Sequence, residues 1–258
     1  MLMAIDVGNT NMVFGLFRQK ELVGSFRLGT DPCRTADEIG LLVWDYFRRF
    51  GWDAGEVEDV AVASVVPPVM RALNEAMTKY FGCHPLVVDV DMDPGLPYEI
   101  RGDERLGTDR SAAAIAAMAK YGTPLVVLDF GTATTVDAIS TAGGYLGGSI
   151  AAGVALSAEA LTQKAALLPR VELKCPGRVL GSSAVGQIQA GVMLGYIGAM
   201  EYLIRRTKEE MGGGEIRVVA TGGLAHTVAE NTPLIDIVDD DLVLEGLRLI
   251  YCRHKDGR

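Results

Sequence analysis

Two short polar segments of the chain each separate a pair of apolar runs, and both follow the pattern Asp-x-Gly-polar-x-polar. One begins at Asp6 and the other at Asp129. Glycine lets backbone N–H groups come close to phosphate oxygens, threonine and asparagine add donors, and an aspartate can hold Mg²⁺ directly or through water. This combination indicates binding of a nucleotide polyphosphate, with one segment for each part of the phosphate chain.

Each segment also has the turn chemistry of a β-hairpin, because a glycine-containing bend joins two β-prone runs. The second segment follows the first after about half of the 258 residues. We therefore predict an α/β protein of two lobes, residues 1–122 and 123–258, each starting with such a hairpin. A plain turn with an aspartate cap would explain either segment alone, whereas two copies at half-length spacing favour the nucleotide interpretation.

Helices and strands alternate along the rest of the chain. A helix is predicted after Thr35, which has Glu38 in capping-box spacing, and its end is predicted at Gly51. Further helices are predicted from Pro67, from near Thr108, over 154–167, over 184–210 and at the C-terminus. A loop is predicted over 91–104. This alternation is typical of an α/β fold.

Composition limits the kinds of partner. The formal net charge of −9 and a pI near 4.9 disfavour binding to nucleic acid or to a membrane surface through bulk electrostatics. The four cysteines lack C-x-x-C spacing, so neither a zinc site nor a disulfide framework is indicated. We see no export signal and no membrane span, and a reducing cytoplasm is the simplest location.

Other ligand-binding motifs are incomplete. The chain has no G-x-G-x-x-G, and the glycine spacing after Gly181 places Gln187 where a P-loop needs lysine. The residues from Asp89 resemble the start of a calcium loop, but Pro94 and Ile100 stand where that loop needs glycine and glutamate. We interpret this segment as the exit from a strand.

A series of motifs spanning nearly the whole chain resembles type III pantothenate kinases. These motifs, in order, are "DVGNTN", "TADE", "SVVP", "LGTDR", "LDFGTATTVDA", "YLGGSIAAG", "AALLPRVEL", "TGGLA" and "LVLEGLRLIY". The resemblance implies two ribonuclease-H-like lobes, as in the actin-like ATPases, with a nucleotide cleft between them. It also implies ATP-dependent phosphorylation of pantothenate to 4'-phosphopantothenate, the first step of coenzyme A synthesis. The implied cofactors are ATP, Mg²⁺ and a monovalent cation, K⁺ or NH₄⁺, and the implied assembly is a homodimer.

The resemblance also assigns roles to individual residues. It implies that Asp129 binds the monovalent cation, that Asp6 holds Mg²⁺, directly or through water, and that Asp109 is the general base on the acceptor hydroxyl. The residues that resemble the family's ATP contacts are Asp6, Val7, Gly8, Asn9, Thr10, Asn11, Met12, Val13 and Thr132. Those that fall at its acceptor site are Ile100, Gly107, Thr108, Asp109, Arg110 and Ala184.

Two acceptor-site positions depart from the family pattern. Ile100 stands where a tyrosine is common, and Ala184 stands where a threonine is common. Each lost hydrogen bond would weaken pantothenate binding by up to about tenfold. The alternatives are therefore a related kinase for another small hydroxylated acceptor, or a nucleotide-binding accessory protein of transcription. The presence of Asp109 favours an enzyme.

Overall fold

The computed structural model describes residues 1–90, 92, 94–100 and 105–256. Its contacts group the chain into two compact units. Unit 1 comprises Met1–Gly95, Asp103–Ala116 and Leu242–Arg258, and unit 2 comprises Leu96–Gly102 and Ala117–Asp241. The C-terminal segment thus belongs to the compact unit that contains the N-terminus. The domain boundary after residue 122 stays a prediction.

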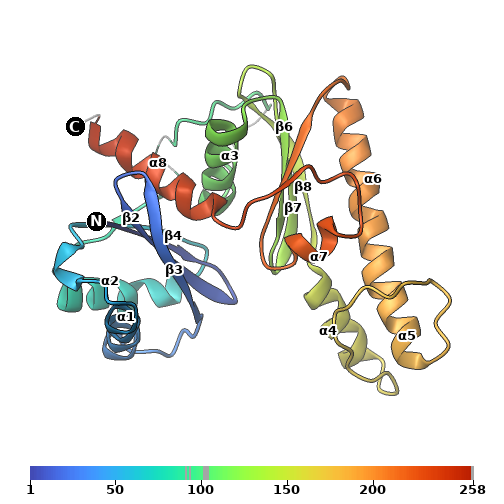
Figure 1. Cartoon of the computed structure of the whole chain (residues 1–258), viewed down its shortest axis with the longest axis horizontal. Helices are drawn as coiled ribbons and strands as arrows, with labels where there is room; N and C mark the ends of the chain where they lie inside the picture. Colours follow the sequence, from blue (N-terminus) through green and yellow to red (C-terminus); the bar gives the residue numbers. More distant parts are fainter. Residues whose placement is uncertain (91, 93, 101–104, 257–258) are drawn as a thin grey trace. The chain divides into compact units, whose positions relative to one another are not determined.

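Unit 1 contains a mixed sheet of five strands in the order β3-β2-β1-β4-β5. Its strands β2, β3 and β4 are labelled in Figure 1. β1 pairs with β2, and β2 with β3, in antiparallel fashion, whereas β1–β4 and β4–β5 are parallel. The strands are β1 (Leu2–Val7), β2 (Asn11–Arg18), β3 (Glu21–Gly29), β4 (Asp59–Ser64) and β5 (Leu86–Val87). The predicted first hairpin is confirmed as β1–β2.

Helices cover both faces of this sheet. On one face, α1 (Ala36–Phe50) and α2 (Pro67–Phe81) bury their apolar sides against β1, β2 and β4. The predicted capping box between Thr35 and Glu38 is present, and Gly51 ends α1 in the left-handed conformation. Between these helices lies a short 3₁₀ turn, Ala54–Glu56. These local signals confirm the predicted start and end of α1.

The other face of the unit 1 sheet carries α8 (Leu242–Asp256) and the first turns of α3 (Thr108–Tyr121). Gly246 in α8 allows a very close approach, because a Cβ there would lie 2.0 Å from the carbonyl oxygen of Ala112 in α3. The helix that carries Asp109 is therefore positioned by backbone contact with α8.

Unit 2 repeats the strand pattern of unit 1. Its order is β10-β9-β6-β7-β8, with β6–β7 and β7–β8 antiparallel and β6–β9 and β9–β10 parallel. The strands are β6 (Leu125–Phe130), β7 (Ala133–Ile139), β8 (Tyr145–Ala152), β9 (Arg217–Thr221) and β10 (Ile237–Val238). Since β6–β7 matches β1–β2 in both topology and sequence pattern, the predicted duplication of an α/β lobe is confirmed.

The helices of unit 2 are α4 (Val154–Lys164), α5 (Ala184–Gln189), α6 (Gly195–Glu210) and α7 (Ala225–Ala229). The single helix predicted over 184–210 is interrupted by a π-helical turn at Ala190–Leu194. Apolar side chains of α6 and α7, such as Ile197 and Val228, pack on one face of the sheet. Within the described residues, no helix is long and apolar enough to cross a membrane.

The last turn of α3 is tied to the segment after β10. Lys120 forms an ion pair with the carboxylate of Asp239, and the Tyr121 hydroxyl donates to the same oxygen at 2.6 Å. Burial raises the pKa of Asp239, but the hydrogen bonds from Lys120 and Tyr121 outweigh it and hold this pKa below its usual value. The carboxylate is therefore more stable as an anion in the folded protein than in the unfolded chain.

Asp239→Asn is expected to lower the free energy of unfolding at pH 7 by about 2 kcal/mol. The stabilisation is present above the carboxyl's unfolded-state pKa of about 4 and is lost as pH falls through the lower folded-state pKa. The difference between the variant and the wild type should therefore shrink in acid. Denaturant unfolding at a series of pH values measures this difference in the free energy of unfolding. Asp240→Asn, which breaks only an exposed pair with His226, is the matched control. An Asp239→Asn deficit that persisted undiminished at pH 3 would contradict the role of the carboxylate.

Candidate functional site

The first predicted phosphate-binding hairpin, β1–β2, is fixed by backbone hydrogen bonds. The Gly8 N–H donates to the carbonyl oxygen of Asn11 at 3.0 Å, and the Val65 N–H donates to that of Val7 at 3.1 Å. Thr30, just after β3, donates its hydroxyl to the Gly8 carbonyl at 2.6 Å and its N–H to the Thr10 carbonyl at 2.9 Å. The turn is thus held in one shape, as a preorganised phosphate site requires.

The predicted ATP contacts of this hairpin differ in exposure. Val7 and Met12 have fully buried side chains in the core under α1 and α2, so only their backbone can face a ligand. Val13 is partly buried against the core on the opposite face, and Asp6 is partly buried at the end of β1. The exposed side chains at the tip are those of Asn9, Thr10 and Asn11.

The second predicted phosphate-binding hairpin, β6–β7, places Asp129 beside glycines from two different segments. A Cβ at Gly222, where φ is +92°, would lie 2.5 Å from Asp129 Oδ1, and one at Gly131 would lie 3.5 Å from it. The carboxylate therefore occupies space that a side chain at Gly222 would fill. Gly222, directly after β9, is needed to accommodate Asp129.

The tip of this hairpin is also packed against the start of α4. The Gly153 N–H donates to the Thr132 carbonyl at 3.0 Å. A Cβ at Gly153 would lie 2.4 Å from the Gly131 carbonyl oxygen and 2.5 Å from that of Thr132. The side chain of Thr132 is exposed, whereas its backbone is held in place by the hydrogen bond from Gly153.

Tyr196 supports the second hairpin from the first turn of α6. Its hydroxyl hydrogen-bonds with the hydroxyl of Thr134, and its ring packs edge to face on Phe130 with centroids 6.2 Å apart. Burial, together with the negative charge of Asp129, raises the pKa of Tyr196 even though the bond to Thr134 acts in the opposite direction. The phenol is thus neutral and donates or accepts within the hairpin.

The proposed acceptor motif lies at the start of α3, within unit 1. The Arg110 N–H donates to Asp109 Oδ1 at 2.8 Å, and the Ser111 N–H donates to the Gly107 carbonyl at 2.9 Å. A Cβ at Gly107 would lie 2.8 Å from Asp109 Oδ1, so the carboxylate folds back over this glycine. Thr108 is buried. One carboxylate oxygen of Asp109 therefore accepts a hydrogen bond within the first turn of α3.

The other two acceptor positions lie in unit 2. Ile100 is partly buried, and its Cγ2 would lie 3.7 Å from a Cβ at Gly147 in β8. Ala184 is exposed at the first position of α5, next to Ser183, whose hydroxyl accepts from the Gly186 N–H at 3.2 Å. The prediction that these residues form one site with Asp109 stays a prediction. Of the predicted loop over 91–104, residues 91, 93 and 101–104 lie outside the described part.

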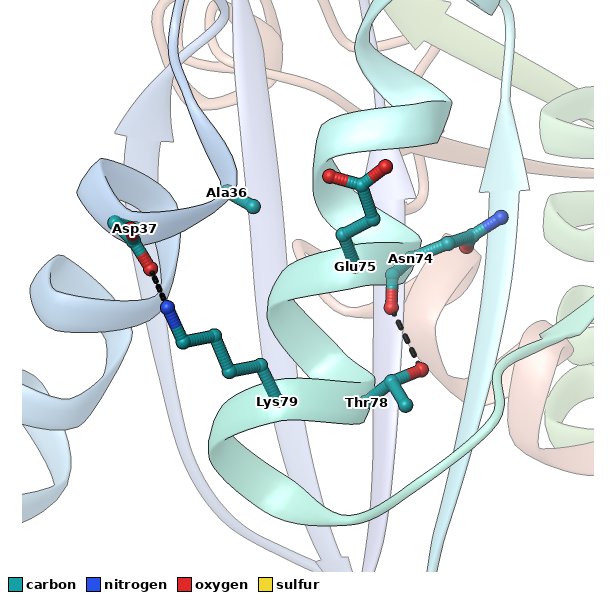
Figure 2. A pocket seen from close by; sticks show the side chains of 6 residues that line it. All are labelled: Ala36, Asp37, Asn74, Glu75, Thr78 and Lys79. Carbon is teal, nitrogen blue, oxygen red and sulfur yellow. Dashed lines mark hydrogen bonds and ion pairs between the residues drawn. The ribbon is translucent and has the colours of Figure 1, made fainter.

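Two cavities in the described residues differ in character. One of about 540 Å³ lies between α1 and α2, lined by Ala36, Asp37, Asn74, Glu75, Thr78 and Lys79. Figure 2 shows that Lys79 reaches across to Asp37, with which it pairs at 2.6 Å. This cation is already neutralised, and no predicted site residue lines the cavity. The other, of about 390 Å³, is mostly apolar and lined by Leu161, Leu168, Ala184, Gln187, Ile188, Gly191 and Val192.

The acidic residues fit magnesium only in company with a nucleotide. No group of three or more His, Cys, Asp or Glu side chains that could hold a metal ion occurs in the part of the chain that the structure describes. Mg²⁺ is commonly held by one or two carboxylates together with substrate phosphates. A single carboxylate at the end of β1, next to a rigid turn with exposed polar side chains, suits that arrangement.

The comparisons with known proteins agree with this architecture. A family model for type III pantothenate kinase matches residues 2–206. The type III pantothenate kinase of Moorella thermoacetica is 46% identical over 254 residues, which cover 98% of this chain and 100% of that protein. The chain belongs to the type III pantothenate kinases. The predicted family is thereby confirmed.

Two solved structures show the same fold at low identity. A protein described as a Baf family transcriptional activator, from Campylobacter jejuni, has a TM-score of 0.61 and 20% identity, covering 98% of this chain and 99% of that one. The activator of 2-hydroxyisocaproyl-CoA dehydratase from Clostridium difficile, solved with bound ADPNP, has a TM-score of 0.54 and 13% identity, covering 99% and 96%. These likenesses confirm the two-lobed α/β fold of this pantothenate kinase family member.

Several supporting residues of this kinase could not be found from the sequence. Thr30 and Tyr196 hold the two hairpins from distant segments, and no local pattern distinguishes them from other polar or aromatic residues. Gly153 and Gly222 had a visible signal, because each is part of a glycine-containing motif at the end of a strand. Their role as backbone contacts of the second hairpin required the structure.

Proposed function

We propose that this protein transfers the γ-phosphoryl group of ATP to the primary hydroxyl of pantothenate, forming 4'-phosphopantothenate in the first step of coenzyme A synthesis. The observation that carries the proposal is the 46% identity to a type III pantothenate kinase over 98% of the chain. The two hairpins and the "GTDR" motif of the family are all present in the chain.

In this proposal the hairpins bind ATP. The Gly8 turn and the exposed side chains of Asn9, Thr10 and Asn11 supply donors to phosphate oxygens, while Val7, Met12 and Val13 contribute their backbone. Asp6 holds Mg²⁺, which neutralises phosphate charge when bound, and Thr132 contacts the nucleotide from the second hairpin. Loose phosphoryl-transfer transition states gain most from positioning and charge neutralisation, which rigid turns provide.

Asp109 acts on the acceptor. Its Oδ1 is engaged by the Arg110 N–H, so we assign Oδ2 to the pantothenate hydroxyl. The carboxylate orients this hydroxyl and accepts its proton as the new O–P bond forms and the bond from the γ-phosphorus to the departing ADP breaks. Gly107, Thr108 and Arg110 complete this part of the acceptor site.

We also propose a monovalent cation at Asp129, a homodimer and a cytoplasmic location. The homodimer is supported by large apolar side chains exposed on unit 2, where Leu167, Val179 and Leu180 are 97%, 71% and 77% exposed. Large exposed apolar side chains of this kind are found at protein interfaces. The cytoplasmic location fits a reaction that consumes ATP.

One observation favours a second candidate, a kinase for a related acceptor. Ile100 and Ala184 are apolar at positions where the family commonly offers hydroxyls. The acceptor of such a kinase would make fewer hydrogen bonds at these positions than pantothenate does in the family. It would still need a hydroxyl within reach of Asp109.

With ATP, Mg²⁺ and K⁺, the purified protein is expected to release ADP faster when pantothenate is added. A coupled ADP assay measures this, and a pantothenate analogue without the primary hydroxyl, which should not stimulate release, is the control. If folded protein at saturating ATP showed no pantothenate-dependent release, pantothenate would be wrong, and a screen of hydroxylated acceptors in the same assay would test the second candidate.

A further inference from the structure

The side-chain hydroxyl of Thr135 makes no hydrogen bond within the described part of the fold. Its hydroxyl oxygen is buried in β7 and has no hydrogen-bond partner among the described residues. The neighbouring Thr134, by contrast, has its hydroxyl paired with Tyr196. Buried hydroxyls nearly always have a hydrogen-bond partner, because removing such a group from water without one destabilises the folded protein. The orphaned oxygen therefore points to a ligand.

The sheet register places this hydroxyl beside Asp129. Thr135 lies directly opposite Asp129 on the neighbouring antiparallel strand, and Thr221 lies opposite Asp129 on the parallel strand β9. Directly paired residues project from the same face of a sheet with their Cβ atoms about 5 Å apart. Thr134 projects from the other face, since side chains alternate along a strand. One face thus gathers a carboxylate and two hydroxyls in a row.

This row of Asp129, Thr135 and Thr221 is buried at one end and exposed to solvent at the other. Thr221 is only 2% exposed, whereas Ile150, which pairs with Thr135 on β8, is 66% exposed. Beside the row, Gly222 and Gly131 present no side chain to Asp129 Oδ1. The row is therefore most exposed at the Ile150 end, and no side chain from these two glycines covers Asp129 Oδ1.

The chemistry of the row suits a monovalent cation better than a divalent one. Hard cations take oxygen ligands, and K⁺ in particular is bound well by neutral oxygens such as carbonyls. One carboxylate balances a single positive charge, and hydroxyls add ligands without adding charge. Tightly bound divalent ions usually collect several carboxylates, and the row contains one; Asp137, the other carboxylate on this face of β7, lies two residues beyond Thr135.

We infer that Thr135 is a hydroxyl ligand of a monovalent cation held by Asp129. This inference rests on the proposed cation site at Asp129 and adds the residue that completes it within β7. The methyl group of Thr135 has no part in this role, so a serine at this position should preserve cation binding and a valine should not.

The test measures cation binding without nucleotide or acceptor. Thermal unfolding is followed while KCl replaces choline chloride at constant ionic strength, with NaCl as the parallel series. The wild type is expected to show a saturable rise in Tm that is larger in KCl than in NaCl. Thr135→Val should raise the half-saturating KCl concentration by about fivefold or more, and Thr135→Ser should stay within about twofold of the wild type.

Controls separate ligation from stability. Thr134→Val loses the bond to Tyr196 and should melt earlier, yet keep the wild-type half-saturation. Thr135→Ala replaces Thr135→Val if the latter does not fold. An unchanged half-saturation in the valine or alanine variant, or an equal change in Thr134→Val, overturns the role of Thr135. A wild type without any K⁺-specific rise overturns the cation site as well, while the ADP assay still tests the kinase proposal separately.

Discussion

Asp109→Asn is expected to lower kcat by about 10²–10⁴-fold while the dissociation constant for ATP stays near that of the wild type. The reason is geometric: the Arg110 N–H occupies Oδ1 at 2.8 Å, so Oδ2 is the oxygen that can orient the acceptor hydroxyl and take its proton. In the variant, an amide NH₂ replaces the carboxylate oxygen that accepts this proton. The hydroxyl then loses both its acceptor and its orientation.

A purely structural role for Asp109 predicts a different result. Asparagine is also a good residue at a helix start, and its amide oxygen can still accept from the Arg110 N–H, so stability should change little. Steady-state kinetics with the acceptor identified in the ADP assay, together with a separate ATP-binding titration, distinguish the two roles. Near-native turnover in Asp109→Asn would show that the general base lies elsewhere.

Asp37→Asn is the matched control for this substitution. Asp37 is the second residue of α1, as Asp109 is the second residue of α3. It pairs with Lys79 and accepts from the Tyr80 hydroxyl, but its side chain is 56% exposed. Loss of such an exposed pair changes stability little, and turnover should not change. The comparison separates a catalytic carboxylate from a carboxylate that only favours a helix N-terminus.

The parts of the fold that the sequence predicted are those that depend on neighbouring residues. Thr35, Glu38 and Gly51 define α1 by interactions within one turn, and the β1–β2 and β6–β7 hairpins follow from glycine between β-prone runs. Local chemistry of this kind acts the same way in any context. The repetition of the hairpin was enough to predict a duplicated lobe.

Long-range packing could not be predicted in the same way. The C-terminal helix α8 packs on the N-terminal sheet through Leu244, Leu247 and Ile250, although the chain order suggests that it belongs with the second half. Cross-strand register decides that Thr135, and not Thr134, shares a face with Asp129. A shift by one residue would exchange the two threonines, and the sequence pattern "TATT" does not distinguish them.

Gly153→Ala is expected to weaken ATP binding strongly while leaving the rest of the fold in place. The added Cβ would stand 2.4 Å from the Gly131 carbonyl oxygen and 2.5 Å from that of Thr132, distances that real contacts do not reach. Both obstacles are backbone atoms, so the turn itself must move. Overpacking of this kind costs about 1–3 kcal/mol, equivalent to about 5–150-fold in the dissociation constant for ATP if the turn binds the nucleotide.

The backbone conformation of Gly153 does not confuse this test. Its φ of −63° and ψ of 154° are available to alanine, so the effect comes from the contact and not from strain at residue 153. Gly198→Ala in α6 is the control, because no atom lies within 4 Å of its added Cβ and alanine favours a helix interior by about 0.5–1 kcal/mol. Binding titrations with ATP and thermal unfolding are compared for both variants. If Gly153→Ala lowered Tm but bound ATP as the wild type does, the tip of the second hairpin would not contact the nucleotide, and the assignment of Thr132 would be wrong.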